Sequence, residues 1–366
     1  MSTAEFPAVS LLLPNRNNEP VLDLALERLA THTTYPNFEL IVVDDGSTDR
    51  SLDILKRWRA EARFEHFTLL VTEHAGVGAA LNRALEHAGG DIAVSLDGDA
   101  TIETPGWLER MVAFQRSDPR IGVVTPAVTH DTGRVHAHGI NLVCAEGLHD
   151  GTTQVKEPVG RRTLHVNVER PRAADVSRVD AEVDAALGVG MLFPRALARE
   201  LGDYDLGFAP VWFEDLDLSL SMRRLDAKVF CLPEVNFLHR GSLRNVRETT
   251  TAAGLMRSRA RRALGRVVAQ PVKDVLIAAA RLNRVRPEQR ARMEHHYRYW
   301  REKWGFDLLN PDMDEIARLY GSTEVCWATN PDRRRAGEDI LRQWELQTSA
   351  SAGRDSTPAG SRVADA

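Results

Sequence analysis

The sequence predicts an α/β protein with a mostly parallel sheet flanked by helices. Short apolar runs of strand length alternate with segments of helical periodicity between residues 9 and 125, which is typical of βαβ units. Hydrophobic residues make up 43% of the chain and charged residues 27%, as in ordinary globular proteins. The 366 residues are enough for about two domains.

The expected strands are short apolar runs bounded by turn-forming residues. Pro14 ends the first run, and the acidic sequence DDGSTD follows the second. The strands expected in this region are residues 9–13, 38–43, 67–71, 92–96 and 121–125. The intervening segments place apolar residues three or four positions apart, as Leu22, Leu26 and Leu29 do, which is the period of a helix packed on a core. The helices are expected over residues 19–30, 51–58, 79–88 and 107–114.

The pattern changes after residue 125. Residues 130–180 are polar and have no clear period, so we expect an irregular excursion over the surface. Regular structure returns with a segment over 183–193, a helix over 194–201, a helix after Phe213 and a strand over 228–232.

The C-terminal part of the chain has a different composition. Residues 251–281 have the spacing of an amphipathic helix with arginines on its other face, continuous or broken at Pro271. Residues 347–366 contain no core-forming side chain except Val363, so we expect this tail to be disordered.

The net charge of −5 hides an asymmetry along the chain. Residues 240–304 contain 17 lysines and arginines against 5 acidic residues, whereas the remainder is acidic. A basic segment of this kind suits a phosphate-bearing ligand, an anionic membrane surface or the acidic body of the protein itself.

The sequence favours a cytoplasmic location. No apolar run approaches the about 20 residues that a membrane-spanning helix needs, and the first ten residues lack the pattern of a secretory signal. The three cysteines, Cys144, Cys231 and Cys326, are far apart and odd in number. This argues against a disulfide framework or a zinc site.

Two acidic motifs directly follow expected strands. Asp44 and Asp45 begin DDGSTD, and Asp97 and Asp99 flank Gly98 in the sequence DGD. Ligands of open α/β sheets bind beyond the carboxyl ends of the strands. The two carboxylates of DGD can face one Mg²⁺ or Mn²⁺ ion, which prefers oxygen ligands. A turn with a helix cap explains DDGSTD equally well, whereas the position of DGD favours a ligand site.

Two later motifs are less specific. Glu214, Asp215 and Asp217 lie at the start of an expected helix, where acids can complement the helix dipole or one of them can act as a general base. His239 follows a strand, and a lone histidine is more often structural than a ligand. A metal role for His239 therefore depends on its lying near Asp99.

The segment 76–81 resembles part of a dinucleotide-binding fingerprint. Gly76 and Gly78 open a helix, and Asp97 follows 21 residues after Gly76. Leu81 stands where the third glycine belongs, however, and the segment follows the third strand instead of the first. These departures disfavour a nicotinamide-dependent dehydrogenase.

The order of the motifs resembles family 2 glycosyltransferases of the GT-A fold. PNRNNE follows the first strand, DDGSTD the second and DGD the fourth, and GVGMLFPRAL, FEDLDL and FLHRGS come later in that order. The resemblance covers about residues 9–242. It implies a GT-A catalytic domain over 1–242, with a nucleotide-sugar half over about 1–125 and an acceptor half over about 126–242, followed by a basic helical extension over 243–346 and the tail 347–366.

The resemblance also implies roles for individual residues. Asp215 would be the base that deprotonates the acceptor hydroxyl, and Glu214 would hold the acceptor. Asp99, Asp97 and His239 would hold Mn²⁺ or Mg²⁺. The residues implied in donor binding are Pro14, Asn15, Arg16, Glu19, Asp44, Asp45, Gly76, Asn82, Asp97 and Gly98. Those implied at the acceptor site or a lid are Trp212, Gly190, Arg240 and Arg244.

The implied reaction is an inverting, metal-dependent transfer of one sugar from a nucleoside diphosphate sugar to a hydroxyl group. The acceptor would be a glycan, a lipid-linked glycan or a small molecule, and no nucleic acid partner is expected. The chain departs from the family pattern because PNRNNE lacks the tyrosine of P-x-Y-N-x-E, and because it has no Q-x-x-R-W motif of processive synthases.

Several alternatives stay open at this point. A sugar-phosphate nucleotidyltransferase has a related fold, but its basic glycine-rich loop is missing after the first strand. A catalytically inactive protein that binds nucleotide sugars or glycans is the other alternative, and the presence of both DGD and FED argues against it. The basic C-terminal helices can contact a membrane peripherally or pack on the catalytic domain, with packing favoured. The oligomeric state is open.

Overall fold

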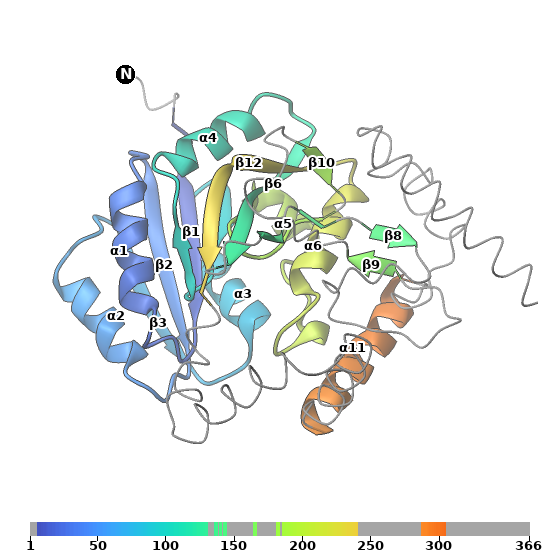
Figure 1. Ribbon diagram of the computed structural model, residues 1–366, viewed down its shortest axis with the longest axis horizontal. Coiled ribbons are helices and arrows are strands. Elements are labelled where there is room, and N and C mark those ends of the chain that lie inside the picture. The colour runs from blue at the N-terminus through green and yellow to red at the C-terminus, as the bar shows by residue number, and fades with distance from the viewer. Residues whose placement is uncertain are drawn as a thin grey trace, which may run out of the picture.

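The computed structural model describes residues 6–130, 135–137, 139–140, 142–144, 164–166, 181–183, 185–240 and 287–304. A large sheet runs through the centre of this part of the chain, with helices packed against it (Figure 1). In order across the sheet, the strands are β10 (Ala181–Val183), β12 (Lys228–His239), β6 (Ile121–His130), β11 (Met191–Pro194), β4 (Ile92–Ser95), β1 (Val9–Asn15), β2 (Phe38–Asp45) and β3 (Phe67–Thr72).

The sheet has a parallel half and a mixed half. The strands β4, β1, β2 and β3 run parallel to one another, and β6 runs parallel to β12. Strand β11 lies antiparallel between β4 and β6 and so joins the two halves. Short strands extend the mixed half, because β5 (Ala100–Ile102) pairs with β12 and β7 (Val135–Ala137) pairs with β6. A separate pair consists of β8 (Leu142–Cys144) and β9 (Leu164–Val166).

Helices cover both faces of the sheet because the buried strands present apolar side chains on both sides. In β1, Leu11 and Leu13 belong to one buried cluster, and Leu12 belongs to the other. The first cluster contains α1 (Leu22–His32), α2 (Ser51–Ala60) and α4 (Trp107–Gln115). The second contains α3 (Val77–His87), α5 (Arg195–Glu200) and α6 (Glu214–Arg223).

A third cluster lies outside these two layers. It joins α6 to the short helix η3 (Leu206–Phe208) and to the C-terminal helix α11 (Pro287–Trp304). Figure 1 shows α11 alongside the lower end of this region, away from β1–β3. None of the described helices is both long and apolar enough to cross a bilayer.

The predicted α/β class is confirmed, with differences at particular elements. Strand β6 continues to His130, five residues beyond the expected end, and β12 continues to His239. The expected segment 183–193 overlaps the end of one strand, β10, and most of a separate strand, β11. Strand β5 was not expected at all, since three residues after DGD carry no local strand signal. The predicted helix over 251–281 and the tail 347–366, like most of 130–180, lie outside the described residues.

Candidate metal and nucleotide site

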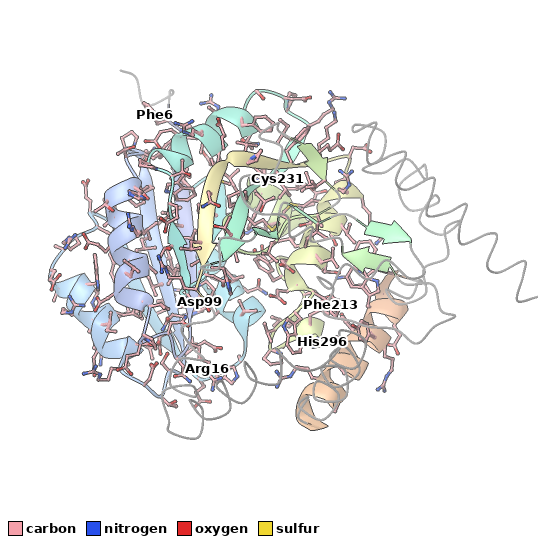
Figure 2. The ribbon with its side chains drawn as sticks, in the orientation of Figure 1. Phe6, Arg16, Asp99, Phe213, Cys231 and His296 are labelled. Carbon is pink, nitrogen blue, oxygen red and sulfur yellow. The ribbon has the colours of Figure 1, made fainter. Side chains whose placement is uncertain are left out.

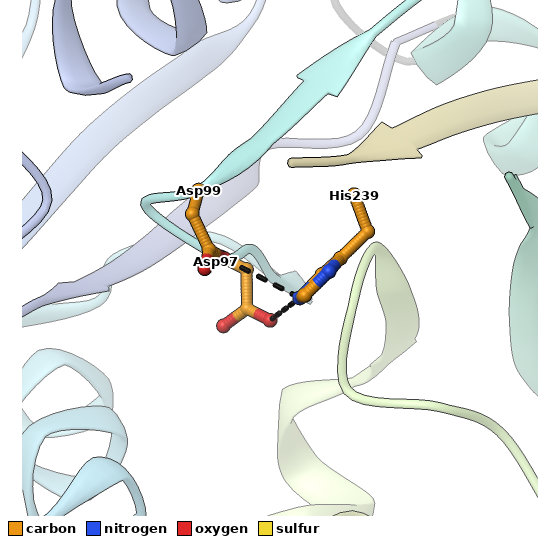
Figure 3. A group of neighbouring side chains, drawn as sticks. All are labelled: Asp97, Asp99 and His239. Carbon is orange, nitrogen blue, oxygen red and sulfur yellow. Dashed lines mark ion pairs between the residues drawn. The ribbon is translucent and has the colours of Figure 1, made fainter. Parts of the chain in front are cut away.

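Asp97, Asp99 and His239 converge on one point at the end of the sheet (Figure 3). Their candidate ligand atoms all lie within 4.8 Å of one another. Nε2 of His239 is 3.4 Å from Oδ1 of Asp99 and 3.9 Å from Oδ2 of Asp97. The condition that the sequence set for a metal role of His239 is therefore met.

The backbone brings this histidine to the acidic motif from 140 residues further along the chain. In the antiparallel pair β5–β12, His239 is opposite Ala100, the residue after Asp99. The N–H of Arg240 then donates to the carbonyl oxygen of Asp99 at 2.8 Å. Gly98 leaves room for a close approach in the turn, because a Cβ atom there would lie 2.5 Å from Nδ2 of Asn18. The motif DGD therefore packs closely against the loop after β1.

The donor set fits a divalent cation. Two carboxylates and one imidazole nitrogen are suitable ligands for Mn²⁺, and the carboxylates are suitable for Mg²⁺. Asp99 is almost fully buried, with 5% of its surface exposed, whereas Asp97 and His239 are partly exposed. The group is therefore rigidly placed on one side and accessible on the other, as a catalytic cation site needs to be.

The three residues form part of the wall of a pocket of about 1030 Å³. This volume is at the upper end of the range typical of small-molecule sites. The other walls are the loop after β1, the DDGSTD turn, the start of α3, the loop before α6 and one residue of α11. The predicted site residues that line it are Pro14, Asn15, Arg16, Asp45, Gly76, Asp97, Gly98, Asp99, Trp212 and His239.

Asp45 lies at the end of the pocket formed by DDGSTD. Its carboxylate accepts hydrogen bonds from the N–H groups of Ala75 at 2.7 Å and Gly76 at 3.0 Å. Nδ1 of His74 is 2.7 Å from Oδ2 of the same carboxylate, and the His74 ring also lines the pocket. Through these contacts Asp45 links the end of β2 to the loop after β3 and orients His74.

Two other predicted donor residues, Asp44 and Glu19, stabilise the DDGSTD loop without lining the pocket. Asp44 accepts hydrogen bonds from Nδ2 of Asn15 at 2.9 Å and from Oγ of Ser47 at 2.7 Å. Glu19 accepts a bond from Nε of Arg50 at 2.9 Å. Neither carboxylate lines the pocket.

Glu214 and Asp215 begin helix α6 beside the pocket without lining it. Burial raises the pKa of the Glu214 carboxyl well above its ordinary value, and the charges of Asp215 and Asp97 add to the effect. Burial also raises the pKa of Asp215, although its carboxylate accepts hydrogen bonds from the N–H groups of Gly188 at 2.8 Å and Leu216 at 2.7 Å.

The remaining predicted residues that the structure describes do not line the pocket. Asn82 forms a two-way hydrogen-bonded pair with the backbone of Tyr204, at 2.8 Å in each direction. Gly190 has a φ of 78° and packs against Phe237 in the sheet. Arg240 donates from Nε to Thr101 Oγ1 at 3.1 Å. Arg244 lies outside the described residues.

Gly76, which belongs to the segment that resembles a dinucleotide fingerprint, has a packing role in the structure. A Cβ atom on Gly76 would lie 2.4 Å from the Cα of Pro210, and the N–H of Val77 donates to the carbonyl oxygen of Pro210 at 2.8 Å. The close approach at Gly76 is therefore to the loop before α6. Asp97, the candidate ribose acid of that fingerprint, belongs to the metal group.

The lining residues that are absent from the predicted site include Asn18, His74 and Arg292. His74 had a usable signal, because it follows a parallel strand next to the one that ends in Asp45. Arg292 had none beyond the basic charge of its segment, since it reaches the pocket from helix α11.

The sequence of the first half of the chain matches a known family. Residues 10–169 match the model of the family described as glycosyl transferase family 2. Among curated relatives, the putative glycosyltransferase EpsH of Bacillus subtilis is 34% identical over 132 residues, which are 36% of this chain and 37% of EpsH. The O-antigen biosynthesis protein RfbC of Myxococcus xanthus is 24% identical over 240 residues, 64% of this chain and 17% of RfbC.

Solved structures are also similar. The mannosyltransferase PcManGT of Pyrobaculum calidifontis, in complex with GDP-Man and Mn²⁺, aligns over 82% of this chain and 88% of its own, with 20% identity and a TM-score of 0.47. The chain spans between 15% and 38% of the length of the first four curated relatives that it matches. The family match spans residues 10–169, which is less than half of the chain, and over these residues the chain is similar to glycosyl transferase family 2.

Proposed function

We propose that the protein is an inverting glycosyltransferase that transfers one sugar from a nucleoside diphosphate sugar to a hydroxyl acceptor. The observation that carries the proposal is the convergence of Asp97, Asp99 and His239 at a pocket that the DDGSTD loop also lines. The family of the domain supports the same reaction class. The acceptor is a glycan, a lipid-linked glycan or a small molecule.

In this proposal the two ends of the pocket hold different parts of the donor. The nucleoside lies beside Asp45, and the diphosphate lies beside Asp97, Asp99 and His239. Asp97, Asp99 and His239 would hold a divalent cation, which would supply neutralisation of the charge that develops on the leaving diphosphate. Without the cation, the carboxylates of Asp97 and Asp99 would repel the diphosphate from this position, because like charges repel at short range.

The chemistry on the acceptor belongs to the start of α6. Asp215 takes the proton of the acceptor hydroxyl as its oxygen bonds to the anomeric carbon. The bond from that carbon to the diphosphate oxygen breaks, and the nucleoside diphosphate leaves. Attack from the opposite face inverts the anomeric configuration. The raised pKa of the buried Asp215 carboxyl supports this role, because a general base works best with a pKa nearer to the operating pH.

Nucleotide binding tests the donor site directly. The melting temperature is measured with UDP, GDP, dTDP, CMP and NAD, each with and without Mn²⁺. We expect stabilisation by one nucleoside diphosphate only with Mn²⁺, of about 2.7 kcal/mol when the ligand is at 100 times its Kd. Asp99→Ala should abolish it, and the control Asp53→Asn, on the exposed side of α2, should retain it. Stabilisation by NAD, or a shift indifferent to Mn²⁺ and to Asp99, would contradict the proposal.

The assignment of the base has its own test. Asp215→Asn should abolish sugar transfer and leave the Mn²⁺-dependent nucleotide shift intact, since the side chain lies outside the pocket lining. Unchanged turnover in this variant would remove Asp215 as the base. The anomeric configuration of the product decides between inversion and retention.

A further inference from the structure

Helix α11 is built into the body of the protein by a buried aromatic contact. Trp300 and Trp304 are almost fully buried, and they join Phe208 of η3 and Leu216 and Leu220 of α6 in one cluster. The rings of Trp300 and Phe208 are 5.9 Å apart. Burying two tryptophans removes a large apolar area from water, so this face of α11 belongs to the core.

A buried polar network fixes the same helix. Asp217 of α6 is 2% exposed, and it accepts a hydrogen bond from Nε1 of Trp304 at 2.8 Å and one from Nζ of Lys303 at 2.8 Å. Tyr299 donates from its hydroxyl to Asp205, at 2.9 Å from one carboxylate oxygen. A buried carboxylate needs such partners, so these contacts specify where α11 lies along α6.

Helix α11 also supports the loop that forms one wall of the pocket. Nε2 of His296 is 3.1 Å from the carbonyl oxygen of Ala209, and the His296 ring is 6.1 Å from that of Phe213. Figure 2 shows Phe213 and His296 close together where α6 meets α11. Within this loop Trp212 and Phe213 have positive φ values of 84° and 74°. Two successive side-chain-bearing residues hold this conformation only when their surroundings impose it.

Arg292 lies one helical turn before His296 and therefore on the same face of α11. It lines the pocket together with Pro210, Val211 and Trp212. Among the described residues, no carboxylate oxygen lies within 4.0 Å of its guanidinium nitrogens. Lys303, which lies further along the same helix, in contrast pairs with the carboxylates of Asp205 and Asp217.

We propose that Arg292 binds a phosphate group of a substrate in this pocket. A guanidinium group can donate two parallel hydrogen bonds to phosphate oxygens, and it keeps its charge at every physiological pH. The inference rests on the proposed function, which brings phosphate to the pocket in one of two ways. The phosphate belongs to the donor diphosphate, or it belongs to a phosphorylated acceptor.

Binding of phosphate probes to purified full-length variants tests the proposal. The probes for the donor are UDP and GDP with Mn²⁺, the matching nucleosides without phosphate, and inorganic pyrophosphate. The probe for the acceptor is farnesyl phosphate, compared with farnesol, in the presence of saturating nucleoside diphosphate. The variants are Arg292→Gln, Arg292→Lys and the control Arg298→Gln, which changes an exposed arginine of the same helix.

We expect Arg292→Gln to weaken one phosphate probe by about 10- to 100-fold, the usual effect of removing a charge-assisted hydrogen bond. Binding of the nucleosides or farnesol should not change, and Arg292→Lys should recover part of the loss. Loss for UDP, GDP or pyrophosphate identifies the donor diphosphate as the source. Loss for farnesyl phosphate alone identifies the acceptor. Melting temperatures confirm that the variants are folded.

Two results would overturn the proposal: wild-type protein that binds none of the phosphate probes, or Arg292→Gln that binds all of them as tightly as wild type. The proposed function fails separately. Wild-type protein that binds pyrophosphate through Arg292, but no nucleoside diphosphate in a metal-dependent way, would contradict the glycosyltransferase proposal and leave the phosphate site standing.

Discussion

The environment of Glu214 disfavours the ionised form of its carboxyl group. Its Oε2 atom is buried and has no hydrogen-bond partner among the described residues. Its pKa is raised because burial and the nearby charges of Asp215 and Asp97 disfavour the ionised form. Such groups lower stability, and proteins keep them where function requires them.

Glu214→Gln should therefore stabilise the protein at neutral pH. When the folded pKa of an acid is raised, the unfolded chain releases its proton first as the pH rises, so stability falls between the unfolded and the folded pKa. The glutamine does not titrate, so its advantage should be absent near pH 4 and grow toward pH 8. Urea denaturation at the two pH values measures this, with the exposed Glu65→Gln as control. Equal stability of Glu214→Gln and wild type at pH 8 would contradict the assigned strain.

Gly76 offers a second test at the scale of one residue. Gly76→Ala places a Cβ atom 2.4 Å from the Cα of Pro210, at a φ of 107°. Gly202→Ala is the matched control, because Gly202 has a φ of 86° and nothing within 4 Å of the added atom. The control should lose about 1–2 kcal/mol from the positive φ alone, and Gly76→Ala should lose more, with weaker nucleotide binding. Equal losses in the two variants would mean that the contact with Pro210 is not constraining.

The site residues differ in how well the sequence predicts their positions in the structure. Asp97 and Asp99 were predictable because DGD follows a strand and its two carboxylates alternate on an extended backbone. The proximity of His239 could only be a condition, since it depends on the pairing of β12 with β5. Arg292 could not be placed, because no local pattern tells which face of a distant helix meets a pocket.

At the scale of elements, the parallel half was the predictable part. The strands β1 and β4 are mostly apolar and buried along their whole length, which is the pattern of a strand buried on both faces. The strands β5, β10 and β11 have three or four residues each and lie in the mixed half. Their pairing is set by long-range contacts, which leave no periodic signal in so short a segment.

The docking of α11 can be tested through Lys303. Lys303→Met removes the cation beside the buried Asp217 and leaves its charge uncompensated, which should cost about 3 kcal/mol of unfolding free energy. Adding Asp217→Asn to this variant should recover part of the loss, because the neutral amide can still accept the bond from Trp304. Urea denaturation followed by circular dichroism gives both values, with the exposed Glu302→Gln as control. A loss within 0.5 kcal/mol of the control, the usual range for surface changes, would show that the network does not hold the helix.

At the scale of the whole molecule, the α/β class and the order of the motifs were predictable, and the closure of the pocket was not. The parallel half contributes the loops after β1 and β2 and the DGD turn, and the mixed half contributes His239 and Trp212. Helix α11, which belongs to neither half of the sheet, adds Arg292 to the pocket. The prediction that C-terminal helices pack on the body holds for α11, whose aromatic and polar contacts bury one of its faces.

The position of Arg292 late in the chain has a consequence for how the protein is made. Domains fold during synthesis, which proceeds at about 5–20 residues per second. On that scale, Asp99 leaves the site of peptide-bond formation about 10–40 seconds before Arg292 does. A nascent chain thus has time to form its sheet while the wall supplied by α11 does not yet exist. Newly made protein would bind a phosphorylated substrate fully only after helix α11 has been synthesised and has docked.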